Sequence, residues 1–107
     1  MRKVLAKVDD GRFGRAVAGL VTRVLVVKEI THREKEVCAV VVSYGKKGTR
    51  EFGVCIRGQQ VFCSCRDFRE HGVHCKHIAA VALNEMGAAA QARSERSEVV
   101  ELVGRRG

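Results

Sequence analysis

The sequence contains no proline and no tryptophan, and its 107 residues include one tyrosine and four phenylalanines. So few aromatic side chains give little support to a stacking platform for single-stranded bases. There is no run of 18 apolar residues and no signal-like start, so we expect neither a membrane-spanning nor a secreted protein. A chain of this length predicts one domain with one modest core.

The sequence also lacks the motifs of common enzyme classes. It has neither a Walker phosphate loop nor the glycine-rich dinucleotide fingerprint. No Ser/His/Asp grouping stands out. We therefore expect a binding or scaffolding module and not an enzyme.

Cysteine and histidine are concentrated in residues 61–83, where three of the five cysteines and three of the four histidines lie. Cys63 and Cys65 are separated by one residue, as are Cys75 and His77, and nine residues lie between the two pairs. Alternate residues of a strand point to the same side, and a helix start favours a thiolate. The spacing therefore predicts a tetrahedral structural zinc site with these four ligands.

Other interpretations of this stretch remain open at the level of sequence. The Cys63–Cys65 pair is also compatible with a redox dithiol, and another thiophilic metal could replace zinc. His71 and His74 compete with His77 for the fourth ligand position, but we expect both to be exposed in a loop at 66–74.

The motif Cys-x-Cys, nine residues, Cys-x-His resembles the signature of the SWIM zinc-finger family. The resemblance includes the apolar strand before the first pair and the Ile/Ala/Val/Leu helix after the second. It implies one zinc ion per chain and a module that contacts DNA or proteins. Small stand-alone members resemble partners of recombinase-like ATPases in homologous-recombination repair. A pure protein adaptor without nucleic-acid binding is the alternative.

The formal net charge is +8, from 20 basic and 12 acidic residues. Such an excess favours a polyanionic partner, DNA before RNA, although solubility alone could explain it. We expect neither a membrane nor a small-molecule partner. The basic residues near the expected hairpin, turn and finger are the candidate phosphate contacts: Lys46, Lys47, Arg50, Arg57, Arg66, Arg69 and Lys76.

The pattern of apolar residues predicts an α+β domain over residues 1–87. A helix capped by Asp9 or Asp10 carries an apolar stripe at helical spacing, comprising Phe13, Ala16, Val17, Leu20 and Val21. A small antiparallel sheet of about four strands follows, at residues 24–30, 37–44, 50–56 and 59–65, with a polar turn at 31–36 that includes His32. The zinc finger ends the last strand, and a buried helix occupies 78–86.

Two further expectations concern the remaining cysteines and the chain end. Cys38 and Cys55 lie in predicted strands and are expected in the core, with a cross-strand pair as the alternative. Because a metal accounts for the other three, a reducing cytoplasmic setting fits better than a disulfide framework. Residues 88–107 form a charged extension in which 97–103 is a docking helix or folds back on the chain.

Overall fold

The computed structural model describes residues 1–87 of the chain. The expectations for residues 88–107, including the docking helix at 97–103, lie outside the described residues. Within them the elements follow in the order α1 (Arg2–Ala6), α2 (Asp10–Thr22), β1 (Leu25–Arg33), β2 (Glu36–Gly45), β3 (Gly48–Arg57), β4 (Gln60–Cys63), α3 (Arg66–His71) and a helix over residues 76–87.

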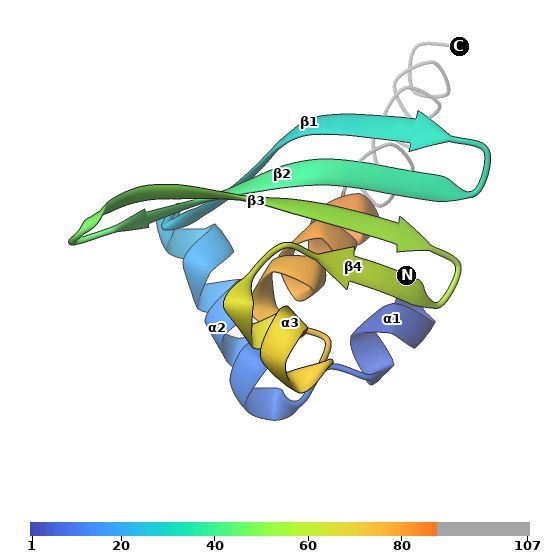
Figure 1. Ribbon diagram of the computed structural model, residues 1–107, viewed down its shortest axis with the longest axis horizontal. Helices are drawn as coiled ribbons and strands as arrows, with labels where there is room; N and C mark the ends of the chain where they lie inside the picture. The colour runs from blue at the N-terminus through green and yellow to red at the C-terminus, as the bar shows by residue number, and fades with distance from the viewer. Residues whose placement is uncertain (88–107) are drawn as a thin grey trace, which may run out of the picture.

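The four strands form one antiparallel sheet in the sequential order β1-β2-β3-β4. The helices of residues 1–87 gather on one side of this sheet, and no other element of these residues covers its opposite side (Figure 1). The α+β architecture expected from the sequence is therefore confirmed. No helix within residues 1–87 is long and apolar enough to cross a membrane.

The core lies between the inner face of the sheet and the helix at 76–87. Val41, Val54 and Ile56 supply the sheet side, and Ile78 and Val81 pack against them, all at most 2% exposed. The residues at 78–82 are all buried, which agrees with the prediction of a helix covered on more than one side.

Helix α2 begins as predicted, because the Asp9 side chain accepts a hydrogen bond from the Arg12 backbone N–H at 2.9 Å. Its orientation differs from the prediction. The helix buries Ala16 and Gly19, whereas Phe13, Val17 and Val21 are 38%, 37% and 78% exposed; these three are called the α2 stripe below.

A close approach to the sheet explains this orientation. A Cβ atom at Gly19 would lie 2.6 Å from both Cγ and Cδ1 of the buried Leu25. Gly19 therefore faces β1 and Leu20 packs against the core as the predicted stripe requires, whereas Phe13, Val17 and Val21 remain outside.

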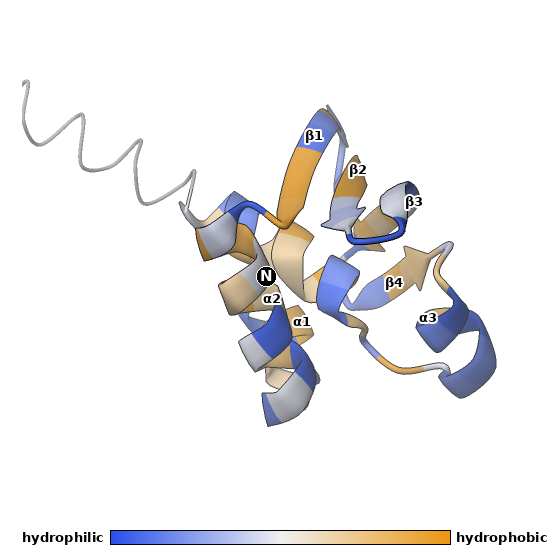
Figure 2. Cartoon of the chain, turned by 90° about the vertical axis from the view of Figure 1, so that its left-hand side faces the viewer, coloured by the Kyte–Doolittle hydropathy of each residue, from blue (hydrophilic) through white to orange (hydrophobic). Residues whose placement is uncertain are grey.

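The first hairpin is longer than expected. Strand β1 runs through Arg33, so residues 31–33 belong to a strand and the turn shrinks to residues 34–35. A bulge between Lys28 and Thr31 keeps the strands paired, with Glu29 at a φ of 51°. Figure 2 shows β1 changing from hydrophobic in its first half to hydrophilic towards its end.

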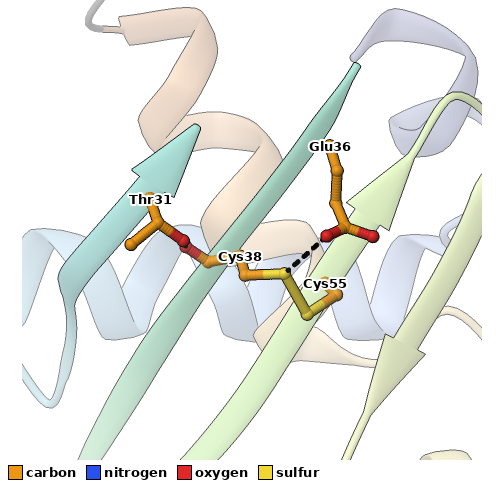
Figure 3. Close-up of a disulfide and its surroundings, with 4 residues drawn as sticks. All are labelled: Thr31, Glu36, Cys38 and Cys55. Carbon is orange, nitrogen blue, oxygen red and sulfur yellow. Dashed lines mark hydrogen bonds between the residues drawn. A yellow bond between two sulfur atoms is a disulfide. The ribbon is translucent and has the colours of Figure 1, made fainter. Parts of the chain in front are cut away.

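The expectation that Cys38 and Cys55 are buried core residues is wrong. They lie opposite one another on β2 and β3, both are half-buried, and they form a disulfide. The pair lies in front of the sheet, with the helices behind (Figure 3). Glu36 Oε1 lies 3.6 Å from Cys38 Sγ, but a disulfide sulfur has no proton to donate, so this is a contact only.

Candidate metal centre

The four predicted zinc ligands come from the ends of three elements. Cys63 is the last residue of β4, and Cys65 lies immediately before α3. Cys75 precedes the helix at 76–87, and His77 lies in its first turn. All four meet beneath the sheet, at the point where β4 gives way to the helices.

The segment between the two ligand pairs is more ordered than predicted. The expected loop at 66–74 contains α3, which Cys65 caps by accepting a hydrogen bond from the Phe68 N–H at 3.4 Å. Gly72 ends the helix in the left-handed region, with a φ of 62°. The sequence had placed Cys65 on the same strand as Cys63. Its position is set instead by the start of α3, which it caps.

The ligand atoms of these four residues lie within 4.8 Å of one another. His77 Nδ1 lies 3.7 Å from Cys63 Sγ and 3.8 Å from Cys75 Sγ. A tetrahedral ion with usual Zn–S and Zn–N bonds separates its ligand atoms by roughly 3.6–3.8 Å. The Cys3His cluster can therefore bind one zinc ion.

The cluster is closed to solvent. Cys63 and Cys75 are fully buried, and Cys65 and His77 are 3% and 5% exposed. The His77 ring stacks on Phe52 with a centroid distance of 4.2 Å, which fixes the direction of its Nδ1. Four buried protein ligands are typical of a structural zinc site, because a catalytic site keeps one position open.

Interactions among the three thiols raise the pKa of some and lower that of another. The Cys63 thiol donates to Cys75, which lowers the pKa of Cys75 to about 4 and raises that of Cys63. Burial raises the pKa of Cys65. Cys75 is therefore the thiol of this cluster that ionises most readily, and a cysteine must ionise to bind a metal.

The other three histidines lie outside this cluster. His71 ends α3 and is exposed as expected, whereas His74 is half-buried. His32 is exposed on β1, where its Nε2 lies 2.9 Å from Glu85 Oε2 of the last helix.

The structure divides the seven candidate phosphate contacts. Lys46 and Lys47 form the exposed turn between β2 and β3, and Arg50 follows them on β3. Arg50 also approaches the finger, where Arg66 and Lys76 lie. By contrast, Arg57 is at the opposite end of β3, and Arg69 is exposed on α3 three residues after Arg66.

One contact between α2 and the finger could not be found from the sequence. Both nitrogens of the Arg12 guanidinium fork donate to Asp67, at 2.7 and 2.8 Å, and a third nitrogen reaches Asp9. Arg12 thereby lowers the pKa of the Asp67 carboxyl. These residues are 55 positions apart, and their contact ties α3 to α2.

A hollow of about 270 Å³ adjoins the metal centre. Its basic lining comes from α2, β3, α3 and the start of the last helix, and comprises Arg12, Arg15, Arg50, Arg66 and Lys76. Phe52, Cys75 and His77 form part of its wall, so the hollow and the metal centre share residues.

Comparison with known proteins gives one match. The family described as SWIM zinc finger matches residues 40–85, which include all four clustered ligands. No curated protein and no solved structure matches the chain.

Proposed function

Because this chain carries a SWIM zinc finger at residues 40–85, we propose that it is a zinc-stabilised module that binds nucleic acid, DNA before RNA. The charge of the protein supports a polyanionic partner. A role in recombination or repair follows from the family resemblance alone and remains part of the proposal.

One observation carries this proposal: a basic surface runs from the β2–β3 turn to the finger. Arg50 lines both the depression at the turn, beside Lys46 and Lys47, and the hollow beside the metal centre. None of these three makes an ion pair within residues 1–87. Unpaired cations on one continuous surface are what contact with several phosphates requires.

The experiment is fluorescence anisotropy of zinc-loaded protein with a labelled DNA duplex of about 20 base pairs, an RNA of the same sequence and a single strand. We expect binding at about 50 mM salt that weakens steeply towards about 200 mM. No binding at the lower salt concentration would contradict the proposal.

A matched pair of variants tests the surface. Lys46→Ala/Lys47→Ala removes two charges from the β2–β3 turn, and Lys35→Ala alters the β1–β2 turn at the other end of the sheet. On the duplex, the first variant should reduce the magnitude of the slope of log K against log salt by roughly 1.8, and the second should leave the slope unchanged. Equal effects of the two would show that binding is not confined to this surface.

A second candidate function is a protein adaptor, which the α2 stripe favours. Phe13, Val17 and Val21 recur every four residues and are exposed on one side of the helix. Exposed apolar rows of this kind are typical of protein contacts. Family resemblance suggests a recombinase-like ATPase as the partner.

Val21→Glu separates the two functions, because Val21 is 78% exposed and can be replaced without disturbing the core. Loss of a recombinase-like partner from a pull-down, with DNA binding retained, would favour the adaptor. Retention of the partner by this variant would exclude the α2 stripe as its contact.

We propose no catalytic role and no redox role. The closed Cys3His set supports a structural metal, and thiols that are at most 3% exposed are inaccessible to a redox partner. We place the protein in the cytoplasm, or on the nucleoid of a prokaryotic host, because the proposed DNA partner is there. Slow zinc loss to a chelator, accompanied by unfolding, is the expected behaviour; rapid loss without unfolding would contradict a structural site.

A further inference from the structure

The hollow beside the metal centre brings together cations from elements that are distant in sequence. Arg15 comes from α2, Arg50 from β3 and Lys76 from the first turn of the last helix. Arg50 and Phe52 are two residues apart on a strand, so both face the helices. The cations therefore lie on the same side of the sheet as the metal centre.

The basic residues of the hollow differ in the partners they already have. Arg12 is engaged by Asp9 and Asp67, and Arg66 pairs with Glu70 at 2.6 Å. Arg15, Arg50 and Lys76 make no ion pair within residues 1–87. These three are called the open cations below.

Neither the metal centre nor the acidic residue of the hollow accounts for the open cations. Asp67 also lines the hollow, but both its oxygens accept hydrogen bonds from Arg12. Three thiolates and one Zn²⁺ carry a single negative charge, which is too little to balance three cations. The start of the helix at 76–87 adds a partial positive charge at the same place. Such a hollow attracts an anion with more than one charge-bearing oxygen.

We propose that this hollow is a phosphate subsite of the nucleic-acid interface, in which the open cations hold one phosphate group of the strand. This inference depends on the function proposed above. Phe52 provides an apolar wall, which lowers the local dielectric and strengthens each charged contact. The volume of about 270 Å³ lies below the roughly 300–1,000 Å³ of small-molecule pockets, which fits one phosphate with its sugar.

The test compares two arginines of the same strand. Arg50→Ala removes an open cation, and Arg57→Ala removes an exposed arginine from the far end of β3, outside the hollow. Neither side chain forms an ion pair within the described residues, so both variants should keep wild-type zinc content and unfolding midpoint. Binding is measured by anisotropy with a labelled oligothymidylate of about 15 nucleotides.

We expect Arg50→Ala to weaken binding about tenfold, as for the loss of one charged hydrogen bond to phosphate. Its salt slope should fall by about 0.7, the value for one phosphate contact on a single strand. Arg57→Ala should bind like the wild type. A change of less than twofold for Arg50→Ala, or equal losses in both variants, would overturn the subsite.

A competition arm distinguishes the strand from free phosphate as the source of the anion. Inorganic phosphate is added to the wild type and to Arg50→Ala, against chloride at equal ionic strength. Displacement of the oligonucleotide by phosphate beyond that by chloride, seen in the wild type and absent from Arg50→Ala, supports a strand phosphate, because the strand and the free ion then compete for the hollow. Phosphate that binds the wild type through Arg50 and leaves the oligonucleotide bound would assign the hollow to the free ion and overturn the proposal.

Nucleic-acid binding and the phosphate subsite can be refuted separately. If the wild type binds neither the oligothymidylate nor the duplex and RNA used to test the function, the proposed function fails together with its subsite. If the wild type binds and Arg50→Ala binds equally well, the function stands and only the subsite is overturned.

Discussion

Replacing each of two glycines of α2 with alanine should change stability in opposite directions. A Cβ at Gly19 would lie 2.6 Å from Leu25 Cγ and Cδ1 and 3.2 Å from its Cβ, whereas a Cβ at Gly14 would meet nothing within 4 Å. Both substitutions gain about 1 kcal/mol of helix propensity. At Gly19 the buried leucine, 3% exposed, has no room to move, and overpacking costs about 1–3 kcal/mol.

Both variants gain the same helix propensity. The difference between their free energies of unfolding therefore measures only the contact between the new Cβ at position 19 and Leu25. Gly14→Ala should stabilise the protein by about 1 kcal/mol, and Gly19→Ala should be about 1–3 kcal/mol less stable than Gly14→Ala. Thermal unfolding of zinc-loaded protein resolves this difference, because 1 kcal/mol shifts the midpoint by about 4–8 °C in a domain of this size. Equal midpoints would refute the packing of α2 on β1, and with it the position of Arg15 in the hollow.

Further predictions concern the sulfur atoms. Cys75→Ser should abolish binding of one zinc per chain, measured by elemental analysis, and remove on the order of 10 kcal/mol of folding free energy; a folded, zinc-loaded variant would exclude Cys75 as a ligand. Because the metal-free chain is expected to unfold, its three ligand thiols return to ordinary pKa values of about 8.5, so zinc binding near pH 7 should release about three protons. Apparent zinc affinity should then rise about 1,000-fold per pH unit near pH 7 in chelator competition, and an affinity that does not rise with pH would contradict binding by thiolates. Opening the Cys38–Cys55 disulfide, which closes a separation of 17 residues, should cost about 3 kcal/mol of stability and leave zinc content unchanged. The Cys38→Ser/Cys55→Ser variant should show the same loss and no response to reductant, whereas loss of its zinc would contradict the separation of the two sites.

Those parts of the fold that depend on neighbouring residues could be predicted from the sequence. The ligand spacing at Cys63, Cys65, Cys75 and His77 is local to two short segments, and the structure brings these residues together. Strand boundaries near the β2–β3 turn follow from the polar Gly-Lys-Lys-Gly stretch between two β-branched runs. Local chemistry alone sufficed for both.

The features that the sequence did not predict are contacts between segments that are distant in the sequence. An apolar periodicity cannot show which side of α2 faces the sheet, because this depends on how closely Gly19 lets Leu25 approach. The link between Arg12 and Asp67 likewise depends on the final placement of α3.

One missed feature did leave a signal in the sequence. A two-residue turn at Lys46 and Lys47 sets the register of the hairpin and places Cys38 opposite Cys55. The cross-strand pair could therefore have been predicted by counting outward from the turn. The prediction instead followed the tendency of free cysteine to behave as a small buried apolar residue.

The sheet also keeps two kinds of sulfur chemistry apart. Exchange between thiolate and disulfide requires direct attack of one sulfur on another. Phe52 stacks on His77 and faces the metal centre, and Cys55 lies three positions further along β3, so its side chain projects from the opposite face, away from the helices. The sheet therefore separates the metal-binding thiolates from the Cys38–Cys55 disulfide and prevents them from attacking it. Oxidation or reduction of this disulfide need not release the zinc ion bound on the helix side of the sheet.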